Sequence, residues 1–353
     1  MTAADRAVVS GRLTSQLLAG VPAPTPEDVV DRLLAVQAQD PRGARLAVRS
    51  RSSGVVASDI DDALTTNRSL VVTWLNRGTL HLVTANDYWW LHPLTTPQLS
   101  VSNNRRLRQE KVSAAQAEHG VAIITEAVAD GPQRRQALRT RLDAAGIPTA
   151  GQAFVHLLLA ATLRGHVVRG PMIDGEHAFV SVEAWLGSPP PELERDDALA
   201  RLARRYMAGH GPAAAADLAR WAGITLGDAR RGVAAIAGEL VPFGDGLLRL
   251  ADVGDVAPLP PPRLLGAFDP LLLGWTSREL FVGAHADVTT DNGLFRPFAL
   301  VKGRVAATWG LSGGVVSIRP LERISAVALR TLVKDAANVL HFLGLPDRPA
   351  IVD

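Results

Sequence analysis

The sequence predicts an α+β protein in which one structural plan occurs three times and a β-rich segment follows. Three observations support this fold class. Pairs of short helical patterns of apolar residues recur, each followed by two strand patterns around a turn. The second and third pairs are joined by the same Ala-Gly-Ile turn, at residues 145–147 and 222–224, where glycine suits a left-handed backbone. Beyond the proline-rich residues 258–262, strand patterns and one amphipathic helix remain. The repeated plan is that of a winged helix-turn-helix unit.

The first copy, expected within residues 1–112, has two amides in place of the glycine turn. A helix over residues 26–36 leads to Gln37 and Gln39, and Pro41 suits the first position of the helix that follows. The wing of this copy has two strands and a turn between them, at residues 71–74, 79–83 and 76–78.

The second copy, residues 113–190, shows the plan most clearly. Its three helices and two wing strands are expected near residues 121–128, 138–142, 149–163, 166–169 and 177–182. Pro171 and the pair Asp174-Gly175 mark the turn of this wing. The third copy, residues 191–255, has a helix that ends near residue 237 and closes with a hairpin across Asp245-Gly246.

The last segment, residues 256–353, is predicted to be a β-meander or a barrel-like arrangement of strands. Strand patterns lie at residues 298–301, 305–309 and 315–318, and glycine-containing turns separate them. An amphipathic helix closes the chain. The sequence therefore predicts four consecutive segments, three winged units and one β-rich end.

The composition excludes several classes of protein. The chain has 353 residues, 47% hydrophobic and 20% charged, so it is long enough for several packed units and is neither collagenous nor mainly disordered. It contains no cysteine, which excludes a thiol nucleophile, disulfides and zinc-thiolate sites. The longest apolar stretch, residues 153–163, is too short to span a bilayer, and the N-terminus has no signal-peptide pattern. We expect a cytoplasmic protein without membrane contact, metal or cofactor.

Common catalytic motifs are missing from the sequence. It has no phosphate-binding loop, zinc-protease helix, nucleophile elbow or dinucleotide fingerprint. His81 lies between two leucines on a predicted strand, which favours a structural role over a ligand role. A predicted helix begins with Asp59, Asp61 and Asp62. Acidic residues at this position stabilise a helix by interacting with the positive end of its dipole, which favours a structural role over an acid–base pair.

Arginines gather directly after the glutamine turn. Four arginines and no acid lie within residues 42–51, and Arg42, Arg45 and Arg49 are spaced along one helix face. The formal charge of the whole chain is only +2, so the position of the charge is more informative than its sum. The helix has the recognition position of a helix-turn-helix, and phosphate contact and a solvated face are both consistent with the pattern. Two later arginine groups are typical of ordinary surface.

Gln37 and Gln39 are the candidate reactive residues. Side chains two residues apart can project to the same side of an extended turn, here directly before the arginine-lined helix. The alternative is that they cap a helix or face water. An amide is no strong base, so any reaction that this pair assists must already have a good leaving group.

Four stretches of the sequence resemble the AlkZ-like family of winged-helix DNA glycosylases. They are LLAVQAQDPR, NRGTLHLV, FDPLLLGW and VKGRVAATW, at residues 33–42, 76–83, 268–275 and 301–309. They follow the family's order and span nearly the whole chain. The resemblance implies that Gln37 and Gln39 are the catalytic pair of a glutamine-aliphatic-glutamine motif. Some family members carry Asp at the position of Gln39, so Gln39 favours the branch that unhooks crosslinks over the one that resembles broader alkylation-repair enzymes.

The resemblance also implies the partner and the other site residues. The partner would be double-stranded DNA with an alkylated or crosslinked guanine, bound by a monomer on an open concave surface of the winged units. The wing of the second unit, around residues 169–177, would probe the minor groove with Gly170-Pro171 at its tip. The expected DNA-contacting residues are Arg42, Arg45, Arg49, Asn76, Arg77, Thr79, His81, Arg169 and His177.

The implied reaction is hydrolysis of an N-glycosidic bond without a strong base. A guanine alkylated on its imidazole ring is cationic and can leave without a general acid, while two amides stabilise an oxocarbenium-like sugar and hold a water. A crosslinked base cannot rotate fully out of the duplex, so the lesion would be approached in place. The three lysines of the chain form no Schiff-base motif, which predicts a monofunctional glycosylase. Azinomycin-type crosslinks as substrate and antibiotic self-resistance as biological role are further implications of the resemblance.

Two other functions are consistent with parts of the sequence. A winged-helix transcriptional regulator would bind undamaged DNA and release no base, but regulators usually have one reading helix per protomer and a dimerisation element, and the sequence has no sustained heptad. A protein that sequesters a drug would need an aromatic-rich pocket. The local aromatic cluster, Trp89-Trp90, is expected in the core instead.

Overall fold

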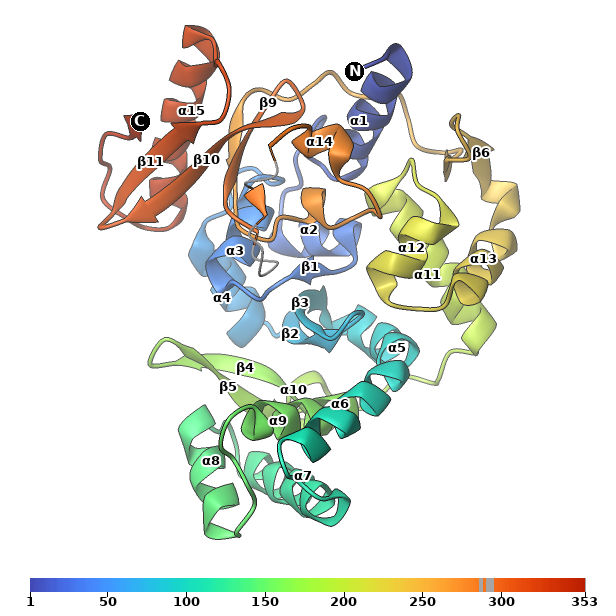
Figure 1. Cartoon of the computed structure of the whole chain (residues 1–353), viewed down its shortest axis with the longest axis vertical. Helices are drawn as coiled ribbons and strands as arrows, with labels where there is room; N and C mark the ends of the chain where they lie inside the picture. Colours follow the sequence, from blue (N-terminus) through green and yellow to red (C-terminus); the bar gives the residue numbers. More distant parts are fainter. Residues whose placement is uncertain (286–287, 290–294, 353) are drawn as a thin grey trace. The chain divides into compact units, whose positions relative to one another are not determined.

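The computed structural model describes residues 1–285, 288–289 and 295–352. The chain folds into two compact units (Figure 1). Unit 1 comprises Met1–Ile60 together with Leu199–Asp353, and unit 2 comprises Asp61–Ala198. Unit 2 is therefore one continuous stretch of chain, whereas unit 1 is assembled from both ends of the sequence.

The two units do not follow the four expected segments one for one. The chain passes from unit 1 to unit 2 within helix α4 (Ala57–Thr65), so the expected first segment contributes to both units. The β-rich segment and nearly all of the expected third copy lie together in unit 1. The four-segment division therefore stays a prediction about local structure.

The strands of unit 2 form two β-hairpins that join edge to edge. These strands are β2 (Leu70–Leu75), β3 (Thr79–Thr84), β4 (Val167–Ile173) and β5 (Glu176–Ser181). β2 pairs with β3 and β4 pairs with β5, as the turn residues predict. In addition, β2 lies antiparallel to β4, with Val72 opposite Arg169. The two expected wings are therefore parts of one sheet with the order β3-β2-β4-β5.

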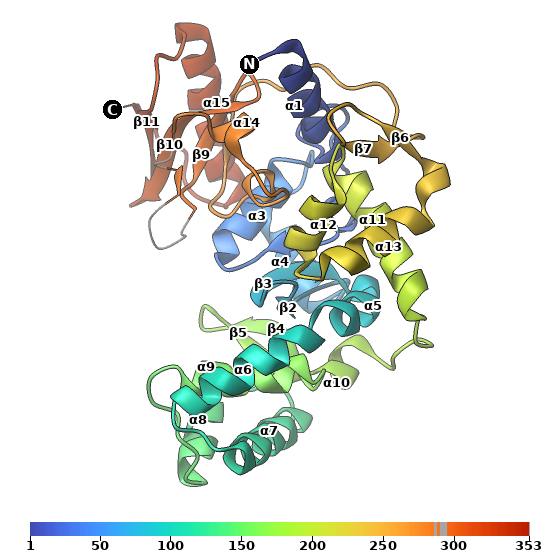
Figure 2. The same ribbon diagram turned by 45° about the vertical axis from the view of Figure 1, so that its right-hand side comes forward.

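The predicted helices of the second copy are present in unit 2. They are α7 (Ala114–Ala129), α8 (Arg135–Ala144) and α9 (Ala153–Leu163), and Gly146 has the expected left-handed backbone, with φ +71°. Helix α9 is apolar on nearly all sides, and α6 (Pro97–Gln109) and α7 pack against it (Figure 2). The helix in the recognition position of this copy thus belongs to the core of unit 2.

The wing tip of unit 2 differs from the sequence prediction. Gly170-Pro171 does not form the tip, because β4 continues through these residues to Ile173. They occupy an irregularity where the register of β4 and β5 shifts between Arg169 and Met172. The turn at the tip is Asp174-Gly175, which has φ values of +51° and +82°. Proline lacks the N–H that a ladder needs, which explains its place at a bulge.

Helices of unit 1 come from both ends of the chain (Figure 1). The N-terminal elements are α1 (Ala3–Ser15), α2 (Pro26–Leu33), β1 (Val36–Gln37) and α3 (Pro41–Arg49). The elements of the expected third copy are α11 (Arg195–His210), α12 (Ala215–Ala222), α13 (Leu226–Ala235), β6 (Leu240–Pro242) and β7 (Leu248–Leu250). Gly223 ends α12 in the predicted left-handed conformation, with φ +71°.

The C-terminal part of unit 1 is an open five-stranded sheet. Its strands are β8 (Arg263–Leu265), β9 (Phe298–Val301), β10 (Arg304–Ser312), β11 (Val315–Pro320) and β12 (Ile351–Val352), in the order β12-β11-β10-β9-β8. Helix α15 (Ala326–Phe342) lies along this sheet (Figure 1). The predicted meander is therefore confirmed, but the strands do not close into a barrel.

The shorter elements complete the described fold. They are α5 (Ala85–Thr95), α10 (Val182–Leu186), η1 (Ala237–Glu239), η2 (Pro270–Leu272) and α14 (Glu279–Val282). Trp90 on α5 is buried, as predicted, and its indole N–H donates to Asp87 over 2.8 Å, whereas Trp89 is only half-buried. In the part of the chain that the structure describes, no helix is long and apolar enough to cross a membrane.

Candidate active site

The glutamine turn connects α2 and α3 in unit 1. Helix α2 begins at Pro26, after Thr25 caps it by accepting a hydrogen bond from the backbone N–H of Asp28. It ends at Leu33, three residues before the predicted end, because Leu34 adopts a left-handed φ of +64° that no helix continues. The chain then runs extended through β1 and carries Gln37.

The two glutamines of the turn have different environments. Gln37 is 8% exposed, whereas Gln39 is exposed to solvent, and the buried Ala38 separates them. The structure therefore buries most of Gln37 and leaves Gln39 open to water. Within the described residues neither amide makes a hydrogen bond. Both amides thus keep their donors and acceptors available.

Asp40 and Gly43 fix the start of α3 directly after the turn. The Asp40 carboxylate accepts a hydrogen bond of 3.0 Å from the backbone N–H of Arg42, and Pro41 occupies the first helical position. One turn later, a Cβ atom on Gly43 would overlap the backbone carbonyl oxygen of Ala267. Only glycine permits this close approach, so the first turn of α3 packs directly on the loop after β8.

A fully buried ion pair holds the chain just after α3 to the same loop. The Arg51 guanidinium donates to the two oxygens of Asp269 over 2.7 and 2.9 Å, and also to the side-chain oxygen of Gln16 over 2.8 Å. The Asp269 carboxylate additionally accepts a hydrogen bond from the backbone of Leu271. A buried ion pair with this many hydrogen bonds is strongly orienting. The sequence pattern did not reveal it, because 218 positions separate the partners.

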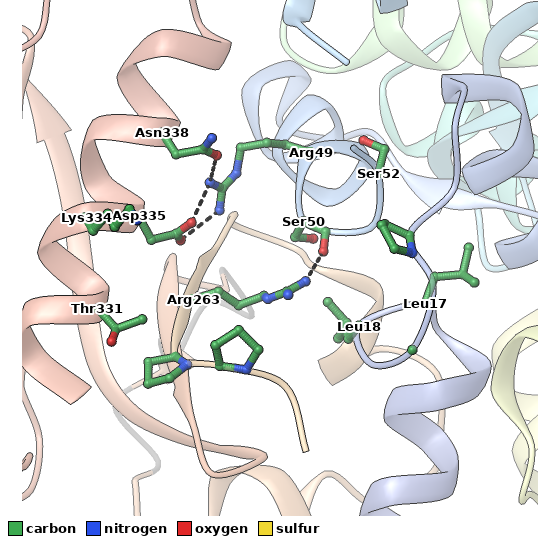
Figure 3. A pocket seen from close by; sticks show the side chains of 14 residues that line it. Leu17, Leu18, Arg49, Ser50, Ser52, Arg263, Thr331, Lys334, Asp335 and Asn338 are labelled. Carbon is green, nitrogen blue, oxygen red and sulfur yellow. Dashed lines mark hydrogen bonds and ion pairs between the residues drawn. The ribbon is translucent and has the colours of Figure 1, made fainter. Parts of the chain in front are cut away.

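Arg49, one of the expected DNA-contacting residues, is engaged by other residues of unit 1. It is buried, and its guanidinium donates to Asp335 over 3.0 Å and to Asn338 over 2.7 Å, as Figure 3 shows. A third contact of 2.7 Å goes to the backbone oxygen of Leu264. Because both terminal nitrogens of Arg49 are bound within unit 1, these contacts favour a structural role over the expected DNA contact.

Figure 3 shows a pocket of about 380 Å³ beside Arg49, at the end of α3 that is remote from the glutamine turn. Its polar wall includes Lys334 and Arg263, whose guanidinium donates to the backbone oxygen of Ser50. Burial lowers the pKa of Arg263, although the Asp335 carboxylate opposes that shift. Gln37 and Gln39 do not line this pocket, so it is separate from the candidate active site.

The other two arginines of α3 lie closer to the surface. Arg42 is exposed in the first turn of the helix. Arg45 is half-buried and donates over 3.0 Å to the backbone oxygen of Pro41. Of the predicted arginine face, the part next to the glutamine turn is therefore the part that reaches solvent.

The expected contacts around the β2–β3 turn in unit 2 are mostly buried. Asn76 is fully buried with a φ of +54°, and its backbone N–H donates to the hydroxyl of Thr95. Nδ1 of His81 lies 2.9 Å from the backbone oxygen of Thr79, and burial lowers the pKa of His81 to about 4. These features suit structural roles, and Arg77 is the member of this group that is exposed.

Arg169 and His177 also lie within unit 2. The Arg169 guanidinium is 4.1 Å from the ring centre of Phe179 and 5.0 Å from that of Trp74. Burial, together with the charge of Arg135, lowers the pKa of Arg169 to about 10. Nδ1 of His177 lies 3.0 Å from the backbone oxygen of Gly170. Arg169 therefore stacks on core rings at the base of the hairpin rather than at its tip.

The described residues contain no group of three His, Asp or Glu side chains that could hold a metal ion.

Comparison with known proteins places the chain in a family. The family model described as "DNA glycosylase AlkZ-like" matches residues 30–342, which include all four stretches noted in the sequence. The chain belongs to the AlkZ-like DNA glycosylase family. Over 99% of both chains, this glycosylase is 25% identical to the interstrand DNA cross-link repair glycosylase of Streptomyces sahachiroi.

A solved structure supports the fold of this AlkZ-like glycosylase. The DNA glycosylase AlkZ of Streptomyces sahachiroi matches the whole chain over its own whole length, with a TM-score of 0.78 and 24% identity. The predicted mixed α+β fold is therefore confirmed. The family also confirms the predicted enzyme class, a DNA glycosylase, and implies a DNA substrate.

Proposed function

We propose that this AlkZ-like glycosylase releases guanines that carry an alkyl group on the imidazole ring. These include guanines within azinomycin-type interstrand crosslinks, and the product is an intact abasic site. The observation that carries the proposal is the glutamine turn, where the side-chain amides of Gln37 and Gln39 make no hydrogen bond within the described part of the chain. The relative from Streptomyces sahachiroi, a cross-link repair glycosylase by name, supports this substrate class.

The two amides would act at the positive charge that develops as the base leaves. An alkylated guanine is already a cationic leaving group, so it needs no proton from the enzyme. Gln37 is the enclosed amide, and its oxygen would stabilise an oxocarbenium-like sugar at short range, where little water weakens the interaction. Gln39 is open to solvent, which favours it as the amide that holds the attacking water.

The carboxylate that directly follows the turn in the chain is consistent with a mechanism without a strong base. Asp40 follows Gln39 directly, but its carboxylate caps α3 through the N–H of Arg42. A carboxylate oxygen engaged in a cap is held at the helix N-terminus, which leaves it poorly oriented toward an attacking water. Normal purines leave well only after protonation, and a pair of neutral amides supplies no such proton, so normal purines would be cleaved poorly.

Contact with DNA is proposed through arginines and a wing. Arg42 and Arg45 follow the turn on α3 and are suited to phosphates, and Arg77 is suited in the same way on the β2–β3 turn of unit 2. Because α9 is buried in the core, we propose that the winged unit of unit 2 meets DNA with its β4–β5 hairpin and not with a recognition helix. The exposed Met172 next to the hairpin turn is an apolar group of the kind that enters minor grooves.

Base release from two duplexes tests this function. One duplex carries a single ring-methylated guanine, and the other carries an azinomycin-type crosslink. We expect wild type to release both bases, and Gln37→Ala and Gln39→Ala to lose roughly 10²- to 10³-fold in rate, since each removes one transition-state contact. Gln109→Ala, which removes an exposed glutamine of α6, is the matched control and should release bases at the wild-type rate.

The same reactions separate the alternatives. Cut strands in the product of purified enzyme would contradict a monofunctional glycosylase. Full release by both glutamine variants would contradict the proposed catalytic pair. A wild-type protein that releases neither base, but binds one undamaged sequence tightly, would support the transcriptional regulator instead.

A further inference from the structure

Phe268 has an unusual backbone conformation within unit 1. Its φ is +56°, in the left-handed region that a bulky side chain rarely adopts. Glycine would adopt this conformation freely, so the loop itself does not require a side chain at this position. Backbone outliers of this kind persist where the surrounding structure imposes them, and they concentrate at functional sites.

Both neighbours of Phe268 are held in place. The carbonyl of Ala267 packs against Gly43, and the carboxylate of Asp269 is bound by Arg51 over 2.7 and 2.9 Å. Ala267 and Asp269 are buried, whereas Phe268 itself is only half-buried. The fixed loop therefore presents part of an aromatic ring to the outside of unit 1.

Two further planar groups extend the ring of Phe268. The ring of Phe295 lies 5.8 Å from it, centre to centre, at an interplanar angle of 53°. The guanidinium of Arg278 lies 4.9 Å from the centre of the Phe295 ring. All three side chains are half-buried. We call Phe268, Phe295 and Arg278 the aromatic platform.

The loop that carries Phe268 packs on the helix that follows the glutamine turn. The carbonyl before Phe268 touches Gly43, which lies only four positions after Gln39 in the first turn of α3.

We propose that Phe268 contacts the DNA substrate by stacking on a nucleobase that is unpaired or unstacked beside the lesion. This inference rests on the proposed function. When the alkylated guanine leaves, the bases that flank the gap lose a stacking partner, and an aromatic ring can replace it. Stacking is tolerant of sequence, because every base has a flat face. Phe295 and Arg278 would support the ring from behind and add a positive charge toward the backbone.

Binding to a product analogue tests the inference without any catalysis. The duplex contains a tetrahydrofuran abasic analogue beside the fluorescent base 2-aminopurine, and the proteins are wild type, Phe268→Gly and Phe268→Tyr. We expect wild type and Phe268→Tyr to bind and to quench the fluorescence. Phe268→Gly should bind roughly tenfold more weakly, which is the scale of one base–aromatic stack, and should not quench.

Two variants guard against a merely structural effect. Asp245→Gly relieves the same kind of backbone conformation, φ +45°, in the β6–β7 turn of unit 1, and it should bind and quench like wild type. Phe268→Leu keeps an apolar side chain but no aromatic face, so it should lose the quenching. Thermal melts of all variants check that they are folded.

The outcomes distinguish this inference from the proposed function. The inference is overturned if Phe268→Gly or Phe268→Leu binds the duplex and quenches its fluorescence like wild type. It is also overturned if the wild-type protein does not bind the abasic duplex. If quenching depends on Phe268 but the protein releases no alkylated base, the stacking role is supported. That result contradicts only the proposed reaction.

Discussion

At the scale of single residues, the site combines features that the sequence reveals with features that it hides. The glutamine turn is visible because both residues and Pro41 are adjacent in the chain. The roles of Arg49 and Arg51 are not visible, since their partners Asp335 and Asp269 lie more than 200 positions away. An arginine stripe on a helix has the same spacing whether it meets phosphates or buried carboxylates. Only the fold decides between these roles.

Buried histidines predict how stability depends on pH. Burial lowers the pKa of His210 to about 3, and it lowers the pKa values of His81 and His92 to about 4. These groups stay neutral in the folded chain but bind protons in the unfolded chain below about pH 6.5. The free energy of unfolding should therefore be highest above pH 6.5 with respect to these groups and should decrease as the pH falls toward 4. Urea titrations at several pH values would measure this decrease.

His210→Phe tests the largest of these effects. The His210 ring stacks on Tyr206 at 4.8 Å, so phenylalanine can keep the packing without the ionisable group. We expect the unfolding free energy of His210→Phe to depend less on pH than that of wild type. His341→Gln changes an exposed histidine and should leave the dependence unaltered. An equal pH dependence in His210→Phe and wild type would contradict the prediction.

At the scale of elements, turns were easier to predict than packing. The hairpins at β4–β5 and β9–β10 were recovered because turn residues such as Asp174-Gly175 and Lys302-Gly303 adopt left-handed conformations that few other residues permit. The union of β2 with β4 was not predicted, because edge pairing leaves no local signal. The burial of α9 could have been predicted, since a helix apolar on all sides is typical of a core and not of a DNA-reading surface.

The close contact between α3 and the loop after β8 gives a second prediction. Gly43→Ala should lower the free energy of unfolding by about 1–3 kcal/mol, because the added methyl group meets a backbone carbonyl that cannot turn away. Gly227→Ala on α13 is the matched control, since its new methyl group has room. That change should raise stability by roughly 0.5–1 kcal/mol. Urea unfolding of both variants measures the difference, and equal effects would refute it.

At the scale of the whole molecule, unit 1 is discontinuous. Residues 187–194, between α10 and α11, are exposed and lack regular structure, which makes them a site for proteolysis. We expect a glutamate-specific protease to cleave at Glu192 or Glu194 in the native protein. The two fragments should stay together on size exclusion, because Arg51–Asp269 and Arg49–Asp335 join their halves of unit 1. They should separate only in denaturant, and separation in native buffer would show that unit 1 is misassigned.

The discontinuity of unit 1 also sets an order of events during synthesis of the chain. A ribosome completes the glutamine turn within the first 40 residues and all of unit 2 by residue 198, yet the loop on which α3 rests follows only at residues 266–269. Unit 2 can fold as it emerges, whereas the N-terminal helices cannot complete their packing until the loop at residues 266–269 is synthesised. A truncated chain that ends before this loop would carry both glutamines without the support that orients them. The ability to break glycosidic bonds thus depends on a segment that is synthesised well after both glutamines.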